Sequence, residues 1–362
     1  MNRKIAIIAL TRKGTELAQR LASSLPKSHL YIPVKFASSQ KKGVYYYHDP
    51  VKETVKKSFH GYDGLVLIMA TGIAVRSIAS ELDNKHKDPA VVVMDEGGKF
   101  AISLISGHIG GANELVRDIT ELVGAQPVIT TASEVSGTIA IDLLGKEFGW
   151  ELEDKTNLTA VSAAVVNGEE VGIYQSCGEQ DWLTEEGRPD NIHIFTDLES
   201  MQKAACAGTI IITDRLLDEE LPEQAILYRP KSLVVGIGCN RGVSCSRIEE
   251  AAQMVLINNG LSIKSIRNIA TIELKRDEAG LLEFAQKYVF PVEFFTEEAL
   301  SQVEFPSSPS NLIYNNVGTY AVCEPAALLS SKNTSLIVPK TKVSGDVTIA
   351  VARISRARKK LQ

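Results

Sequence analysis

Continuous apolar runs recur along the chain, and they constrain its fold more than any other feature. Three examples are KIAIIAL (4–10), GLVLIMA (64–70) and SLVVGIG (232–238). Each run is too short to cross a membrane and has the length of a strand that is buried on both faces. Apolar stripes at helical spacing follow, most clearly over residues 112–123 and 248–256. Strands that alternate with helices of this length predict α/β layers with largely parallel sheets.

The chain has 362 residues, which is enough for two or three domains. The strand–turn–helix pattern weakens in the middle, where a helix is predicted over 139–148, and it restarts near Lys231. The acidic stretch DRLLDEELPEQ (214–224) is expected to be a solvated face or a connector. We therefore predict a multidomain α/β protein with three-layer α/β/α terminal domains. The predicted limits are 1–135 for the amino-terminal domain, 136–228 for a small, variable α/β middle domain and 229–362 for the carboxyl-terminal domain.

Charge and cysteine content narrow the functional classes. The net charge is −5, so no global basic field attracts nucleic acid, and the basic run RISRARKK (353–360) is expected to be a solvated end. The cysteine count of five is odd and the sequence contains no C-x-x-C, which argues against a disulfide scaffold and a structural zinc site. These features, with no secretory signal or membrane span in the sequence, predict a reduced, cytoplasmic protein.

Three glycine-bearing turns are each predicted to follow a buried strand. They are TGIAVR (71–76), SGHIGGAN (106–113) and GIGCNRG (236–242). Glycine lets backbone amides approach a ligand, and open α/β sheets bind ligands at the carboxyl ends of their strands. GIGCNRG does not match the dinucleotide fingerprint G-x-G-x-x-G, because its third glycine comes one residue late. The alternative that the glycines serve only tight turns stays open.

His108 is the sharpest single candidate for proton transfer, because it lies in the second of these turns and imidazole titrates near neutral pH. Asp95 and Glu96 end a predicted strand just before a hairpin turn and are expected near the same strand end as His108. Adjacent carboxylates point to opposite faces of a strand, so at most one of the two serves a given pocket. Structural alternatives remain for all three: helix capping for His108, turn chemistry for Asp95 and solvent exposure for Glu96.

The residues also carry a resemblance. Three segments, 69–79, 88–115 and 127–134, resemble the amino-terminal domain of the CbiG family, the cobalt-precorrin-5A hydrolases of anaerobic cobalamin biosynthesis. The carboxyl-terminal domain of that family is similar to VVGIGCNRGVSCSRIEEA (234–251) and to residues 269–285, 317–329 and 347–353. Together these segments cover both ends of the chain and about two-thirds of it.

The resemblance implies a reaction and its ligand. Members of the family open the δ-lactone of a ring-contracted cobalt tetrapyrrole with water and release a two-carbon fragment as acetaldehyde, leaving cobalt-precorrin-5B. Cobalt arrives with the substrate, so the resemblance implies no cofactor. The expected partner is the cobalt-corrinoid substrate, with no nucleic acid and no membrane. Transient contact with neighbouring pathway methyltransferases and formation of a homo-oligomer are both left open.

With this reaction in view, we expect His108 to move protons, with Glu96 and Asp95 as the alternative bases. Backbone amides at the double glycine are expected to stabilise the oxyanion, and arginine or lysine to bind the substrate's carboxylates. The expected substrate-binding residues are Thr71, Gly72, Arg76, Gly107, Gly110, Gly111, Asn113, Gly238, Cys239, Arg241 and Lys340. The competing hypothesis is a non-catalytic cobalt-tetrapyrrole carrier of the same pathway, and a nucleotide-dependent oxidoreductase is a weaker third.

Overall fold

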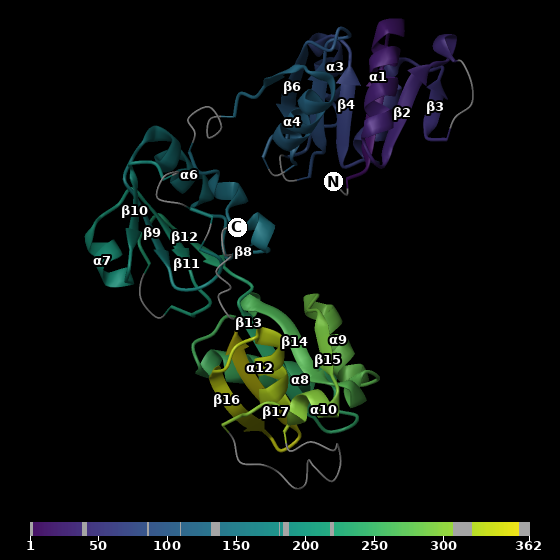
Figure 1. The fold of residues 1–362 in the computed structure, drawn as a ribbon. Helices are drawn as coiled ribbons and strands as arrows, with labels where there is room; N and C mark the ends of the chain where they lie inside the picture. The colour runs from purple at the N-terminus through teal and green to yellow at the C-terminus, as the bar shows by residue number, and fades with distance from the viewer. Residues whose placement is uncertain are drawn as a thin grey trace. The chain divides into compact units, whose positions relative to one another are not determined.

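The structure is a computed structural model that describes residues 3–37, 42–84, 87–108, 110–131, 138–180, 182–183, 188–217, 221–306 and 321–354. It contains three mixed sheets, which follow one another along the chain (Figure 1). The chain divides into two compact units, Met1–Leu143 and Leu144–Gln362, and each is described by itself. No helix among the described residues is both long and apolar enough to cross a membrane.

The amino-terminal sheet has seven strands in the order β3-β2-β1-β4-β5-β6-β7. The strands are β1 (Ile5–Ala9), β2 (Ser28–Pro33), β3 (Val44–Tyr47), β4 (Gly64–Ile68), β5 (Ala90–Met94), β6 (Phe100–Ile105) and β7 (Gln126–Val128). The first five are parallel, whereas β6 runs antiparallel to β5. The strand order reverses between β1 and β4, which is where open α/β sheets form their ligand crevice.

Helices cover both faces of this sheet, as the continuous apolar strands predict. In β1, Ile5 and Ile7 pack into the same core as α1 (Arg12–Ser24) and α4 (Ala112–Val123). Ile8, which points the other way, packs into the core formed with α2 (Val51–Phe59) and α3 (Thr71–Ile78). Alternate residues of one strand thus serve two cores, and the predicted three-layer architecture is confirmed.

The middle sheet has five strands in the order β10-β9-β11-β12-β8. Its elements are β8 (Glu151–Leu152), α6 (Leu158–Asn167), β9 (Val171–Gln175), β10 (Ile192–Phe195), α7 (Leu198–Lys203), β11 (Gly208–Ile212) and β12 (Ala225–Arg229). The helix predicted over 139–148 is wrong. The chain there forms two 3₁₀ turns, η2 (Ile141–Leu143) and η3 (Lys146–Phe148). Gly145, which lies between them, has a φ of +70°, and this left-handed conformation interrupts a helix.

The carboxyl-terminal sheet has the order β15-β14-β13-β17-β16. Its strands are β13 (Leu233–Cys239), β14 (Ile266–Ile272), β15 (Val292–Phe295), β16 (Leu336–Val343) and β17 (Val347–Arg353). On one face lie α8 (Cys245–Asn258) and α9 (Ala279–Tyr288), and on the other lie α10 (Glu297–Ser301) and α12 (Cys323–Ser331). The domain is therefore three-layered, like the first.

The acidic stretch after β11 is not wholly solvated, so that expectation is wrong at its start. Asp214 is fully buried between the middle and carboxyl-terminal sheets. Its carboxylate accepts hydrogen bonds from Nε and Nη2 of Arg353, both at 2.8 Å, and from Ser232 Oγ at 2.7 Å. A carboxylate can be buried at little net cost when it is paired in this way, which composition alone does not reveal. The domain limits near 135 and 229 stay predictions.

Candidate functional site

The carboxyl edge of the amino-terminal sheet brings together loops from three strands. Thr11 follows β1 and caps α1, accepting a hydrogen bond from Gly14 N at 3.0 Å, and its Oγ1 donates to Glu96 Oε2 at 2.7 Å. Thr71 and Gly72 open α3 after β4, beside this point. A Cβ added at Gly72 would lie 3.4 Å from Arg76 Nη2, so the guanidinium folds back over the turn. The side chains of Thr71, Arg76 and Glu96 are exposed at this switch point, whereas that of Thr11 is half-buried.

Asp95 and Glu96 have different surroundings, as adjacent strand residues should. Both oxygens of Asp95 are occupied, because Gly97 N donates to Oδ2 at 2.9 Å while Lys99 N and Phe100 N donate to Oδ1 at 2.8 and 2.7 Å. Asp95 therefore closes the predicted hairpin turn. Of the two carboxylates, Glu96 is the one that contacts Thr11 at the carboxyl edge of the sheet.

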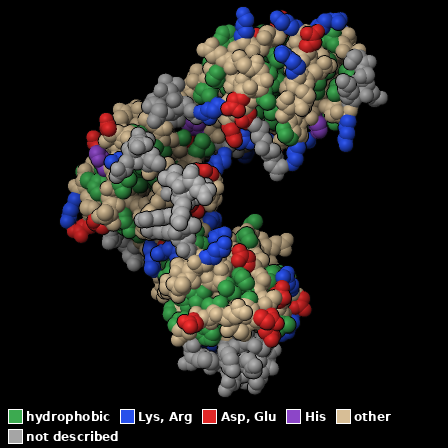
Figure 2. Space-filling model, in the orientation of Figure 1, with side chains coloured by type: hydrophobic (Ala, Val, Ile, Leu, Met, Phe, Trp, Pro, Cys, Tyr) green, Lys and Arg blue, Asp and Glu red, His purple; other side chains and the backbone are tan. Residues whose placement is uncertain are grey.

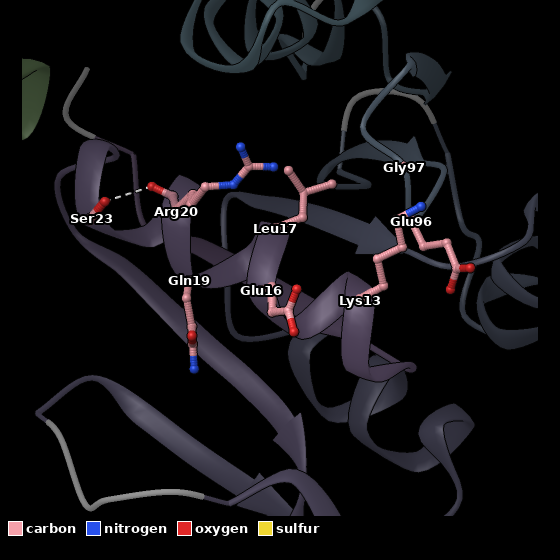
Figure 3. Close-up of a pocket in the computed structure, with 8 residues that line it drawn as sticks. All are labelled: Lys13, Glu16, Leu17, Gln19, Arg20, Ser23, Glu96 and Gly97. Carbon is pink, nitrogen blue, oxygen red and sulfur yellow. Dashed lines mark hydrogen bonds between the residues drawn. The ribbon is translucent and has the colours of Figure 1, made fainter.

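A hollow of about 500 Å³ borders Glu96 on the α1 side of this edge (Figure 3). Its lining carries two cations, Lys13 and Arg20, and two carboxylates, Glu16 and Glu96. Four charges that balance one another give the hollow no overall sign that would favour an anion. Figure 2 shows the same mixture elsewhere, with acidic and basic side chains interspersed over the described surface in view.

The SGHIGGAN turn lies at the opposite edge of the sheet. Because β6 is antiparallel to β5, its last residue, Ile105, pairs with Val91 at the start of β5. The six residues of β6 separate the two edges by about 20 Å. The expectation that His108 shares a strand end with Asp95 and Glu96 is therefore wrong. Residues 71–76, which form the start of α3 and not the expected turn, lie at a different edge from the turn at 106–113.

Three backbone N–H groups of the SGHIGGAN turn bond to carbonyl oxygens of the turn itself. The N–H groups of residues 111, 112 and 113 donate to the carbonyl oxygens of residues 108, 106 and 107, at 3.0, 3.1 and 3.0 Å. These three amides close the turn on itself. They are therefore not directed at an oxyanion, and stabilisation by other amides of the turn stays a prediction.

Close packing explains why this turn needs glycine. Gly111 has a φ of +83°, and a Cβ there would overlap the guanidinium of Arg3, whose Nη1 donates to Gly111 O at 3.1 Å. A Cβ on Gly110 would overlap Ser106, and one on Gly107 would lie 2.7 Å from Asn113 Oδ1. For these three glycines the tight-turn alternative accounts for the geometry.

The side chain of Asn113 is hydrogen-bonded to other residues of the protein. Its side chain is buried, with Oδ1 accepting from Ser103 Oγ at 2.7 Å and Nδ2 donating to Thr131 Oγ1 at 3.1 Å. These bonds join β6, α4 and the segment after β7. Asn113 therefore orients the loop that carries His108.

His108 is paired with a carboxylate that sequence analysis missed. Its Nδ1 lies 3.1 Å from Oδ1 of Asp142, and the two side chains are 14% and 16% exposed. Asp142 is on η2, 34 positions later, in a stretch without a clear pattern, so nothing in the sequence indicated the contact. With the carboxylate at Nδ1, the favoured tautomer carries its proton there and its lone pair at Nε2. This is the arrangement that a general base requires.

The first four residues of GIGCNRG, 236–239, belong to β13, so the expected turn is confined to residues 240–242 at the carboxyl edge of the last sheet. Thr348 Oγ1 donates to Gly238 O at 3.2 Å, which joins the end of β13 to β17. Cys239 is half-buried, and burial raises the pKa of its thiol in spite of the nearby Lys275 ammonium, so the thiol stays protonated at neutral pH. Arg241 is exposed and ion-paired with Asp277, and its Nη2 donates to Leu274 O at 3.2 Å.

Lys340 does not lie at this edge. β16 continues to Val343, past a register shift between Val338 and Thr341 that surrounds Pro339. Lys340 is therefore inside the strand, with its backbone N–H donating to Glu324 Oε1 at 3.0 Å. The expected position of Lys340 near a strand end is wrong, because a bulge carries the strand beyond the proline.

Comparisons with known proteins cover nearly the whole chain. Three family descriptions match in order: "Cobalamin synthesis G N-terminal" over residues 53–134, "Cobalamin biosynthesis central region" over 139–230 and "Cobalamin synthesis G C-terminus" over 233–352. A crystal structure of a putative cobalamin biosynthesis protein G homolog from Sulfolobus solfataricus is 22% identical, with a TM-score of 0.38 and 97% of each chain covered.

Two relatives are named cobalt-precorrin-5A hydrolase. The protein of Priestia megaterium is 41% identical over 355 residues, which cover 96% of this chain and 94% of that protein. The protein of Salmonella typhimurium is 33% identical and covers 96% of this chain and 97% of its own length. The chain belongs to the CbiG family of cobalamin biosynthesis.

Proposed function

We propose that this chain is a hydrolase that acts on cobalt-precorrin-5A, opens its δ-lactone and releases the two-carbon fragment as acetaldehyde. Membership of the CbiG family supports a hydrolase of cobalamin biosynthesis. The observation in this structure that carries the chemistry is the His108–Asp142 pair. A non-catalytic carrier has no need for an imidazole whose tautomer is fixed by a partly buried carboxylate.

In the proposed mechanism, Nε2 of His108 accepts a proton from water as the oxygen of that water attacks the lactone carbonyl. The ester C–O bond then breaks as the His108 imidazolium returns the proton to the leaving oxygen. This gives a carboxylic acid on the macrocycle, which ionises to a carboxylate, and a hydroxyl group on the two-carbon side chain. His108 then accepts the hydroxyl proton and the C–C bond breaks, its electrons passing into the conjugated macrocycle as acetaldehyde leaves. Asp142 holds the ring and stabilises the imidazolium that forms after each proton transfer.

The substrate carries many acetate and propionate groups, which arginine binds well. Arg76, with Thr71 and Gly72, lies at the edge that Glu96 shares and that is opposite His108, so we assign peripheral carboxylates to it in the alternative in which Glu96 is the base. A second set of carboxylates is assigned to Arg241 with Gly238 and Cys239 at another. Both edges lie at the carboxyl ends of parallel strands, where helices begin. Glu96 stays the alternative base, at the edge that Arg76 occupies.

The cellular setting is also part of the proposal. All five cysteines are free in this structure, which supports a reducing, cytoplasmic location. We propose that the only cobalt involved arrives in the substrate, and that the protein uses no cofactor and binds neither nucleic acid nor membrane. A homo-oligomer and transient contact with pathway methyltransferases remain compatible with it.

The test is release of acetaldehyde from cobalt-precorrin-5A by the purified protein without added metal or nucleotide. The proposal expects one acetaldehyde per substrate consumed. Binding of the cobalt tetrapyrrole without acetaldehyde would favour the carrier instead. A requirement for zinc or NAD(P)H would contradict the mechanism.

A further inference from the structure

One buried carboxylate ties the GIGCNRG turn to the neighbouring loop. β13 and β14 are parallel neighbours, so the loops that follow them leave the sheet side by side. Glu278, in the second loop, is 3% exposed and stands at the N-cap position of α9. Its Oε1 accepts a hydrogen bond from Gly242 N at 2.7 Å. The first loop is therefore fixed by a side chain from the second.

The other oxygen of Glu278 faces two cations. Oε2 lies 2.8 Å from Nζ of Lys275, which is itself buried, and 3.9 Å from Nε of Arg241. Burial alone would raise the pKa of Glu278. The Lys275 ammonium and the Gly242 N–H outweigh that effect, so its pKa is lowered and the carboxylate is ionised at neutral pH.

The two loops are too close to move independently. A Cβ added at Gly280, in the first turn of α9, would overlap Val243 O and lie 2.9 Å from Cys245 N. Gly242 has a φ of +79°, so its N–H direction is set by a backbone conformation that few other residues adopt. The guanidinium of Arg241 is held at the rim of this joint, 61% exposed, by Leu274 O and Asp277.

We propose that Glu278 is a positioning residue for substrate binding. It touches no substrate. It sets the direction of the 240–242 backbone. Together with Asp277, its negative charge keeps the Arg241 guanidinium at the rim. There a substrate carboxylate replaces the exposed Asp277 as the ion-pair partner of Arg241. This inference rests on the proposed function, because it assigns to the turn the carboxylates of that substrate.

The test compares Glu278→Gln, Glu278→Ala and a control, Glu273→Gln, in the full chain. Glu273 lies in the same loop, is 45% exposed and pairs with Arg276. Glutamine keeps an acceptor for Gly242 N–H and loses the charge, whereas alanine loses both. Two quantities are measured: the Kd for cobalt-precorrin-5A by absorbance titration, and the hydrogen-exchange protection of the Gly242 amide by NMR.

We expect Glu278→Ala to raise Kd by about tenfold, which corresponds to about 1.4 kcal/mol, and to lose Gly242 protection. Glu278→Gln should raise Kd by a smaller factor and retain protection, and the control should match the parent. In both Glu278 variants kcat should stay within about twofold of the parent, because the interaction stabilises the bound substrate and the transition state equally.

An unchanged Kd in Glu278→Ala despite lost Gly242 protection would overturn the positioning role alone. So would a fall in kcat with no change in Kd. Normal binding by the parent with no acetaldehyde would defeat the proposed function alone, because the titration does not depend on turnover. If the alanine variant does not fold, Glu278→Gln decides: a Kd equal to that of the parent overturns the inference.

Discussion

Oδ1 of Asp142 lies 3.1 Å from Nδ1 of His108, across 34 residues of sequence, and both side chains are largely buried. A carboxylate in this position does two things for an imidazole base: it selects the tautomer and stabilises the protonated ring. The pair therefore predicts that a substitution of Asp142 also lowers the rate of the reaction.

We predict that Asp142→Asn lowers kcat by about 10²-fold, because an amide stabilises the imidazolium less well and no longer selects the reactive tautomer. The Kd for the substrate should change little, since the interaction matters in the transition state. Steady-state assays of acetaldehyde with a binding titration measure both. Parental kcat in the folded variant would mean that the pair is only structural.

Gly111→Ala should destabilise the amino-terminal domain by about 1–3 kcal/mol or more, because a side chain at positive φ is strained and would also displace Arg3. Gly124→Ala is the matched control at the other end of the same helix. Its φ is +71°, but nothing lies within 4 Å of the added Cβ, so it should cost only about 1–2 kcal/mol. Urea unfolding gives both values, and equal losses would refute the role of the Arg3 contact.

Arg241→Ala should weaken substrate binding by about 1.5–3 kcal/mol, the range for hydrogen bonds to charged groups. Arg76→Ala should do the same if the substrate binds at the Glu96 edge, and should have no effect if it binds beside His108. Arg267→Ala is the control, because Arg267 is exposed near the start of β14, at the edge away from Arg241. Absorbance titration with cobalt-precorrin-5A measures the effect. Unchanged Kd values in both variants would remove these arginines from the site.

Asp214→Asn should destabilise the second unit by about 3–5 kcal/mol at pH 7, since it leaves Arg353 without its buried charge partner. Burial alone would raise the pKa of Asp214, but hydrogen bonds from Arg353 and Ser232 and the charge of Arg353 lower it overall. The folded pKa is thus below the unfolded value of about 3.9. The stabilisation is present above that value and is lost as pH falls through the folded pKa.

Urea unfolding at neutral and acidic pH measures how the contribution of Asp214 to stability changes with pH. The difference between the parent and Asp214→Asn should shrink as the pH is lowered below about 3.9. Asp190→Asn, at an exposed position in the same unit, should lie close to the parent at every pH. A difference that grows on acidification would contradict the assignment.

The sequence predicted the layers of the fold well, because strands buried on both faces and amphipathic helices leave direct patterns in it. It also predicted the hairpin turn at Glu96–Lys99. The consequence of that hairpin was missed: an antiparallel β6 carries His108 to the far edge of the sheet from Glu96. The contacts of Asp142, Asp214 and Glu278 were out of reach for a different reason. Each joins segments distant in sequence, and only the packed structure brings their partners within hydrogen-bonding distance.

The central claim is that His108 is the base of the reaction, and the most direct measurement is acetaldehyde release from cobalt-precorrin-5A by folded His108→Ala beside folded Glu96→Gln. The account predicts that kcat of His108→Ala falls by about 10²–10⁴-fold with little change in substrate binding. Glu96→Gln should lose far less activity. Near-parental turnover by His108→Ala at neutral pH, together with a large loss in Glu96→Gln, would contradict the account and move the base to the opposite edge of the sheet.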